Sequence, residues 1–433
     1  MITRILLLRC LGSFTILSLF VGSCSSGAPT PDALSPTPTG QDQMEPTVTA
    51  GPSPTIPPEL APPSPEPTFT PGPSATPLPT PEGQIGPLVY PPGVNSLTGL
   101  LAPDPTSLDR RPLAVKISNF PVCVRPQSGL SAADLVFEHL AEGGTTRFTA
   151  IFYGNNPGTV GSVRSARFLD LEIPAMYQSL LAFSGASVGV LALLDGADFR
   201  PFALSPEFGV RAPAFYRLPL EQTPCGIAGT PLLEHSLFAN TRDLWAYAAS
   251  QGINKRPALT GMTFNGQPPA GGQPGTLLTV PYSASYVTWI YDPNLGLYFR
   301  GQDGGSHVDA NTKLTITAAN VAVIFAPHVI TDIREDSVGY NPTTGQGGNY
   351  SAQIQMWNTG PAILFRDGQA YQGTWTRFGR NDPLAIVFSA DQYVPFRPGN
   401  TWFEVVPLDS AISTEGRNWN VKPTKLPKTP FGP

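Results

Sequence analysis

Residues able to bind or react are concentrated in one part of an otherwise weakly charged chain. Only 13% of the 433 residues are charged, so a local concentration of ionisable groups is informative. The candidates are Arg125, Gln127, Asp134, Glu138, Glu142, Arg147, Arg164, Arg167, Asp170 and, further along, His235. Their types favour either ligand binding or a polar network inside the fold.

Two interpretations of the arginines remain open. In the first, Arg147, Arg164 and Arg167 line a cleft and hold an anionic or sugar-rich ligand through bidentate hydrogen bonds. Arg164 and Arg167 lie three residues apart at an expected helix start, where they would share a face beside free backbone N–H groups. In the second interpretation, Glu138, Glu142 and Asp170 neutralise the arginines in a buried ion-pair network.

Glycan hydrolysis is a competing hypothesis. Glu138 and Glu142 could act as a pair of carboxyl groups on a wall glycan, with one protonated as the general acid. However, Gly143 and Gly144 place Glu142 near a turn, where solvent would leave its pKa ordinary. The sequence contains one G-x-S-x-G match, GASVG at residues 185–189, but its Ser187 is the expected cap of the helix over residues 188–194. We therefore expect no enzymatic activity, with a hydrolase as the alternative.

A metal site is a weaker possibility. Asp303, His307 and Asp309 lie close together in the sequence, but no fourth ligand is evident. Such residues more often order a glycine-rich turn, here residues 301–306. We therefore expect neither a metal nor another cofactor.

The four cysteines divide by position. Cys10 belongs to the N-terminal apolar segment and Cys24 follows it, which leaves Cys123 and Cys225 in the remaining chain. Outside the cytoplasm these two thiols could form a disulfide, or they could stay unpaired as small buried side chains.

The N-terminus has the features of a secretory signal. Residues 1–23 begin with Arg4 and Arg9, continue as an apolar stretch and end in Gly22 and Ser23. The sequence VGSC ending at Cys24 resembles the bacterial lipobox, in which the cysteine after the cleavage site is acylated. We expect residues 1–23 to be removed and Cys24 to anchor the chain to the membrane.

A proline-rich segment follows the expected anchor. Residues 25–82 contain 18 prolines, with Thr, Ser, Ala and Gly, and no Lys or Arg. Such a segment cannot bury enough apolar surface to offset its ordering entropy. We expect residues 24–86 to carry the lipid and form a disordered tether, with a maximum reach of roughly 180 Å at about 3.1 Å per residue.

Beyond the tether, periodicity predicts a mixed first half. Helices are expected over residues 166–178, kinked or split at Pro174, and over residues 188–194 and 237–251, with Ser187 capping the second. Strands are expected over residues 112–118, 135–140, 147–153 and 180–183, the middle two forming a hairpin.

The second half alternates short strands with turns. Strands are expected over residues 277–280, 286–291, 297–300, 321–325, 352–357, 362–366, 371–378 and 402–406. Asp367-Gly368 is a type I′ turn candidate. The fold class is therefore α+β, with an N-terminal α+β domain (87–255), a β-rich C-terminal domain (256–410) and a tail (411–433).

Several motifs resemble one bacterial family. RPQSGLSAAD over residues 125–134, EGGTTRF over residues 142–148 and VRSAR over residues 163–167 are similar to the YerB-like lipoproteins. HVD at residues 307–309, ANV at 319–321 and GTW at 373–375 extend the resemblance over residues 95–408. His235 lies in EHSLF, where the family tends to have PHNLY, so its role is open. The resemblance implies the two domains and an extracytoplasmic location, without a known reaction.

The net charge of the chain limits the classes of partner that it can bind. The formal net charge is −5, and removing Arg4 and Arg9 with the signal makes it −5 − 2 = −7. A negative chain has no general attraction for nucleic acid. We expect a non-catalytic module that binds or assembles in the cell envelope, with peptidoglycan or an envelope-remodelling enzyme as partner. A structural spacer is the remaining alternative.

Overall fold

The computed structural model describes residues 83–344, 347–389 and 392–430. The expected signal peptide, the expected lipidation site Cys24 and the expected tether as far as residue 82 lie outside these residues. Gln84–Ile85, assigned to the tether from sequence, form a strand instead. In the described ranges, every helix is too short or too polar to span a bilayer.

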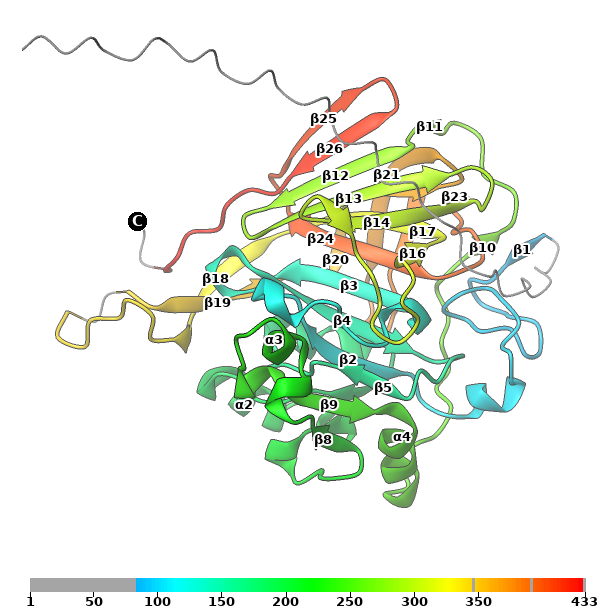
Figure 1. The fold of residues 1–433 in the computed structure, drawn as a ribbon. Coiled ribbons are helices and arrows are strands. Elements are labelled where there is room, and N and C mark those ends of the chain that lie inside the picture. Colours follow the sequence, from blue (N-terminus) through cyan, green and yellow to red (C-terminus); the bar gives the residue numbers. More distant parts are fainter. Residues whose placement is uncertain (1–82, 345–346, 390–391, 431–433) are drawn as a thin grey trace, which may run out of the picture. The chain divides into compact units, whose positions relative to one another are not determined.

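A large mixed sheet runs through both halves of the chain (Figure 1). The first half contributes β2 (Leu113–Ser118), β3 (Leu135–Leu140), β4 (Thr146–Phe152), β6 (Leu180–Ala182) and β7 (Ala203–Leu204). The second half contributes β11 (Gln273–Pro274), β17 (Asn320–Ala326), β20 (Asn358–Arg366), β21 (Gln369–Arg377), β22 (Ala385–Ser389), β23 (Gln392–Tyr393) and β24 (Thr401–Pro407). The halves meet where β24 pairs in parallel with β3 on one side and with β17 on the other.

The central strands are buried on both faces, which explains their nearly continuous apolar sequences. Successive side chains of a strand point to opposite faces of the sheet. On β3, Val136 accordingly joins one hydrophobic core, while Leu135 and Phe137 join the other. The sheet therefore separates two cores rather than covering one.

A second sheet packs against the first of these cores. Its strands are β12 (Leu277–Tyr282), β13 (Ser285–Asp292), β14 (Leu297–Gln302), β15 (Gly305–Ser306), β16 (Thr317–Ala318), β25 (Ala411–Glu415) and β26 (Asn418–Lys422). On β12 and β13, Leu278, Val280 and Trp289 alternate inwards and are fully buried. Residues 411–433, assigned to a tail from sequence, include β25 and β26, and β26 pairs in parallel with β12.

Smaller elements complete the described chain. The remaining strands form small sheets. In these, β1 (Gln84–Ile85) pairs with β10 (Phe264–Asn265), β9 (Leu237–Asn240) pairs with both β5 (Thr159–Gly161) and β8 (Phe215–Arg217), and β18 (His328–Asp336) pairs with β19 (Asn349–Ile354). The helices are α1 (Ile173–Met176), α2 (Val188–Asp195), α3 (Pro224–Ile227) and α4 (Thr241–Ser250). The 3-10 turns are η1 (Pro105–Asp109), η2 (Val122–Val124), η3 (Leu130–Ala132), η4 (Glu142–Gly144), η5 (Phe168–Leu171), η6 (Arg200–Phe202), η7 (Pro206–Phe208), η8 (Leu220–Gln222) and η9 (Leu233–His235).

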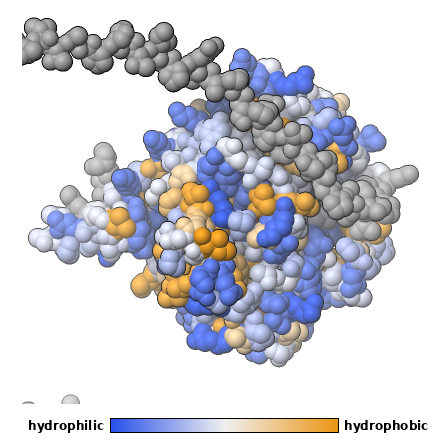
Figure 2. All heavy atoms as spheres, viewed as in Figure 1, coloured by the Kyte–Doolittle hydropathy of each residue, from blue (hydrophilic) through white to orange (hydrophobic). Residues whose placement is uncertain are grey.

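Hydrophobic side chains also reach the surface. Helix α2 exposes Val188 and Leu193, and α3 exposes Ile227. Figure 2 shows hydrophobic residues gathered over these two helices, on a face that is otherwise largely hydrophilic.

Most local predictions are confirmed. The expected strands correspond to β2, β3, β4, β6, β12, β13, β14, β17, β20, β21 and β24, and β3 pairs antiparallel with β4. Ser187 caps α2 by accepting the Val190 N–H. Asp367 and Gly368 both have positive φ, 53° and 72°, as a type I′ turn requires.

Three local predictions need correction. The helix expected from residue 237 begins at Thr241, because residues 237–240 form β9 between β5 and β8. Asn240 ends this strand and caps α4 by accepting the N–H groups of Arg242 and Asp243. The helix expected over residues 166–178 is split, as predicted, but the break lies at Glu172, between η5 and α1, because Pro174 lies in the first turn of α1. The strand expected at 352–357 is β19, three residues earlier.

Candidate functional site

The candidate residues form two buried networks rather than one open cleft. The first network centres on Glu138 of β3 and Arg300 of β14, whose side chains are fully buried and form an ion pair. The Arg300 guanidinium also donates to Gln302 Oε1 (2.8 Å) and to His307 Nδ1 (2.6 Å). It lies over three aromatic rings, those of Trp402, Phe148 and Trp289, at 4.7, 5.5 and 5.7 Å from the ring centroids.

Further hydrogen bonds of this network join the two halves of the chain. His307 Nε2 contacts Gln127 Oε1 at 2.7 Å, so the imidazole donates there and accepts from Arg300 through Nδ1. Burial, then Arg300 and Arg125, hold the pKa of His307 well below its ordinary value. The ring is therefore a neutral connector.

Asp303, His307 and Asp309, the weak metal candidates of the sequence analysis, also join the two halves of the chain. Arg125 pairs with Asp303, and Asp309 Oδ2 accepts the Ser131 N–H at 2.9 Å. Across the described ranges, no group of three or more His, Cys, Asp or Glu has the geometry of a metal site. These three residues instead bind the RPQSGLSAAD motif to the second half.

Glu404 of β24 is a member of the network that sequence analysis missed. It lies opposite Glu138 in the β3–β24 register, and it accepts hydrogen bonds from Tyr282 Oη (2.8 Å) and Trp289 Nε1 (2.9 Å). Burial, then the neighbouring Glu138, raise the pKa of Glu404 to about 8. The available signal was a lone acid within the apolar run WFEVV of residues 402–406.

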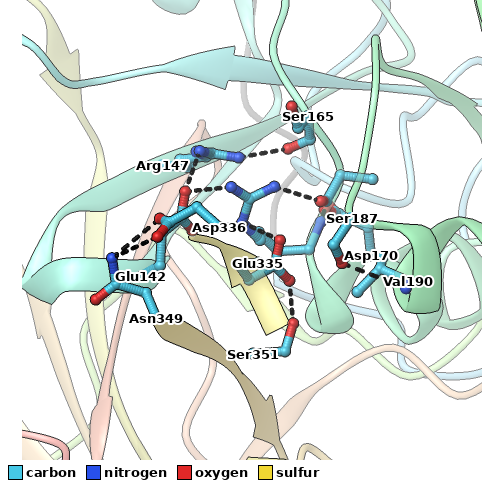
Figure 3. Close-up of polar contacts among 12 residues, drawn as sticks. Glu142, Arg147, Ser165, Asp170, Ser187, Val190, Glu335, Asp336, Asn349 and Ser351 are labelled. Atoms are coloured by element: carbon cyan, nitrogen blue, oxygen red, sulfur yellow. Dashed lines mark hydrogen bonds and ion pairs between the residues drawn. The ribbon is translucent and has the colours of Figure 1, made fainter. Parts of the chain in front are cut away.

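The second network surrounds Glu142 in η4 (Figure 3). Arg147 Nη2 contacts Glu142 Oε1 at 2.6 Å, and Arg167 donates to both carboxylate oxygens. Glu335 of β18 lies 3.5 Å from Arg167 Nε and accepts from the Ser351 hydroxyl. Although burial opposes it, the two guanidinium groups hold the pKa of Glu142 well below its ordinary value.

This arrangement corrects the expected environment of Glu142. Its side chain is only 15% exposed, because β18 and β19 and the two arginines enclose the turn that carries it. The pKa of Glu142 is therefore not ordinary, although Gly143 and Gly144 do follow it in a turn.

The remaining candidates are placed apart. Arg164 precedes η5, is partly buried and donates to the backbone oxygen of Glu234 at 3.1 Å. His235 lies 3.4 Å from Ser118 Oγ, and burial followed by Arg164 lowers its pKa to about 4. The structure thus brings Arg147 and Arg167 together on one carboxylate, while Arg164 makes no ion pair in the described chain.

Asp170 has a different partner from the one expected. It forms a fully buried ion pair with Lys116 at 2.8 Å and caps η5 by accepting the Arg167 N–H. Lys116 also contacts His139 Nε2 at 2.6 Å. Asp134 likewise points inwards and accepts the N–H groups of Tyr153 and Gly154. The geometry favours the ion-pair interpretation of these motifs over the ligand cleft.

A disulfide links the two cysteines of the described chain. Cys123 in η2 and Cys225 in α3 are bonded across a separation of 102 residues. Both lie in the first half of the chain, so this covalent link closes a loop within it.

An open groove of about 1120 Å³ has none of the ion-paired side chains of the two networks in its lining. Both halves of the chain line it, including residues 100–103 of the first half and residues 397–400 of the second. Backbone bonds tie the sides together, from Gly399 N to Thr98 O (2.8 Å) and from Thr401 N to Asp134 O (3.0 Å).

The two halves match two models of one family. Residues 97–254 match the N-terminal domain of a protein family of unknown function, DUF3048, and residues 278–403 match its C-terminal domain. The chain belongs to the DUF3048 family.

A relative and a solved structure agree with this assignment. Over 328 residues the chain is 29% identical to the putative lipoprotein YerB of Bacillus subtilis (strain 168), which is 74% of this chain and 88% of that protein. The crystal structure of YerB from Bacillus subtilis aligns with a TM-score of 0.57 at 27% identity, over 72% of this chain and 95% of that one. The resemblance to YerB-like proteins and the α+β fold class are thereby confirmed.

The family assignment shows that the first network joins the two family domains. Glu138 lies in the N-terminal DUF3048 domain, whereas Arg300 and His307 lie in the C-terminal one. The family motifs at residues 125–134 and 307–309 therefore hold the two domains together. The groove lies at the same junction, where ligand sites commonly occur.

Replacing Glu404 with Gln should change how stability depends on pH. Folding raises the pKa of the Glu404 carboxyl above its unfolded value of about 4.5. This carboxyl therefore contributes fully to the stability of the folded chain below pH 4.5, and the contribution is lost as the pH rises towards 8. The Glu404→Gln variant lacks this titration and keeps the hydrogen bonds to neutral partners. Relative to the variant, the native chain should lose on the order of 4 kcal/mol of unfolding free energy across this window.

Urea unfolding at several pH values between 5 and 8 measures this difference. Glu415→Gln on β25 is the matched control, because Glu415 is exposed. A difference between native chain and Glu404→Gln that stays constant with pH would contradict the prediction.

Proposed function

We propose that this chain is a lipid-anchored, extracytoplasmic protein that binds or assembles components of the cell envelope without catalysing a reaction. In this proposal residues 1–23 are removed, Cys24 carries the lipid and the segment up to residue 82 is the tether, because Gln84–Ile85 already form β1. The relationship to a putative lipoprotein supports the membrane association, and the lipobox-like sequence before Cys24 supports the anchor.

The observation that carries the non-catalytic part is the state of the two candidate acids. A glycosidase needs one protonated carboxyl and a second carboxylate that both reach the sugar. Glu138 is fully buried against Arg300, and Glu142 is held as a carboxylate by Arg147 and Arg167. Neither therefore satisfies the requirement for a reachable general acid.

Binding is favoured over a purely structural spacer by the groove between the domains. A spacer needs no concave surface, whereas this groove is large and backbone bonds join its lining residues from the two halves. The proposed partner is peptidoglycan or an enzyme that remodels the envelope, and the net charge of −7 after signal removal argues against nucleic acid.

Sedimentation with dye-labelled peptidoglycan sacculi tests the proposal. The soluble chain beginning at residue 25 should sediment with the sacculi more than an acidic control protein does, and should release no dye. Dye release that disappears in Glu142→Gln would establish the hydrolase instead. If neither the sacculi nor an envelope membrane extract retains the chain, the spacer alternative replaces the proposal.

A further inference from the structure

Four large apolar side chains project from neighbouring loops of the first half. Phe120 and Val122 lie beside and in η2, Ile227 is the last residue of α3, and Leu233 begins η9. In that order they are 47, 57, 77 and 59% exposed, so they protrude from the surface rather than line a concavity. We call these four residues the loop patch. Exposed apolar side chains that gather in one place mark an interaction surface.

The disulfide joins the loops that carry the patch. Cys123, next to Val122, is bonded to Cys225, two residues before Ile227. This covalent link keeps η2 beside α3, and Figure 2 shows hydrophobic residues gathered over α3. The loop patch is therefore a fixed feature of the fold, which does not need a partner in order to form.

Hydrogen bonds place the other two members of the patch beside each other. The Ser118 hydroxyl donates to the Phe120 carbonyl at 3.0 Å and lies 3.4 Å from Nδ1 of His235. His235 and Leu233 belong to the same 3-10 turn, η9. The segments that carry Phe120 and Leu233 thus meet at Ser118.

The loops around the patch have no charged side chains. Residues 119–124 read NFPVCV, and residues 222–233 read QTPCGIAGTPLL. Residues 227–231 and Leu233 are exposed. Charged side chains would have to leave water on entering lipid, which is costly. Their absence from both loops therefore suits contact with an apolar phase.

Two arginines lie at the edge of the loop patch. Arg217 Nη1 donates to the Leu233 carbonyl at 2.8 Å, and Arg164 Nη1 donates to the Glu234 carbonyl at 3.1 Å. Neither arginine forms an ion pair within the ranges that the structure describes, and the side chains of Glu221 and Glu234 are exposed in the same turns. An apolar centre with guanidinium groups at its edge matches a bilayer surface, where headgroup phosphates lie above the acyl chains.

We infer that the loop patch inserts into the surface of the phospholipid bilayer that holds the chain. Its apolar side chains enter the boundary between headgroups and acyl chains, while Arg164 and Arg217 contact headgroup phosphates. The anchor favours this partner over another protein, because an acylated Cys24 keeps the bilayer within the tether's reach, roughly 180 Å, at high effective concentration. The inference rests on the anchor in the proposed function and adds a second membrane contact, made by the folded part itself.

Partition into phosphatidylcholine vesicles tests the inference. The chain beginning at residue 25 has no acyl group, and it should sediment with the vesicles at millimolar lipid. Ile227→Ser/Leu233→Ser should lower the partition coefficient by roughly 10-fold, because the burial of two apolar side chains is lost. Leu408→Ser/Ile412→Ser is the matched control, since both residues are exposed (48 and 47%) and lie at β25, away from α3 in Figure 1. It should leave the partition coefficient unchanged.

Hydrogen exchange followed by mass spectrometry locates the contact. Vesicles should slow amide exchange in residues 119–124 and 222–233, because these loops leave water when the patch inserts. Exchange in residues 411–422, which form β25 and β26 and the turn between them, should stay the same. Protection confined to other segments would place the vesicle contact elsewhere and overturn the inference.

Three further outcomes contradict it. They are no association with vesicles at millimolar lipid, equal partition of the native chain and Ile227→Ser/Leu233→Ser, or self-association that this variant abolishes while partition is unchanged, since a second copy then covers the patch. Because sacculi hold no bilayer, retention on sacculi without vesicle association removes the inference and leaves the proposed function standing. Vesicle association of the soluble chain, together with unacylated Cys24 in cells, supports the loop contact and removes the proposed anchor instead.

Discussion

Replacing Arg300 with Met is expected to lower the free energy of unfolding by about 3–5 kcal/mol near neutral pH. Methionine keeps much of the side-chain length among Trp402, Phe148 and Trp289 but removes the charge. Glu138 would then be buried without its cation, with Glu404 beside it in the adjacent strand.

Urea denaturation at pH 7 measures this loss. Arg242→Met is the matched control, because Arg242 is exposed on α4 and surface substitutions usually change stability by less than about 0.5 kcal/mol. If Arg300→Met unfolds at the same urea concentration as Arg242→Met, the ion pair does not hold the domains together as described.

Removing the disulfide is the second change with a large expected effect. Cys123→Ala/Cys225→Ala should lower the free energy of unfolding by about 4–5 kcal/mol, because the cross-link restricts an unfolded loop of about 100 residues. The same loss should follow when the native chain is treated with a reductant.

The double variant is the control for the reductant treatment. The reductant should have no further effect on the double variant, which lacks this disulfide. The prediction fails if reduction changes the midpoint of the native chain by no more than it changes that of the variant.

Short-range structure was largely predictable, because it follows local patterns. Alternating or continuous apolar residues identified strands such as β2 and β17, and Asp367-Gly368 identified a turn through its backbone preference. The predicted helix start at residue 237 was wrong because a contact between distant residues decides the structure there. Residues 237–240 could continue a helix, but pairing with β5 and β8 makes them a strand. Tertiary pairing outweighed local preference there.

The partners of the charged residues were much harder to predict. Glu138 meets Arg300 across 162 residues, and no local spacing indicates that pair. Asp170 was expected to neutralise an arginine, but the parallel pairing of β2 with β6 and the position of η5 bring it to Lys116 instead. The resemblance correctly marked these motifs as important, but sequence alone could not decide between ligand contact and domain contact.

The position of β24 constrains the order in which the molecule can mature. This strand, residues 401–407, lies between β17 and β3 and hydrogen-bonds to both. Until this strand has joined the sheet, β3 and β17 each present an open edge, and such edges invite aggregation. Under the proposed export, the chain must therefore be protected outside the membrane until nearly all of it has been delivered, and a stop codon before residue 401 would leave two unfinished halves.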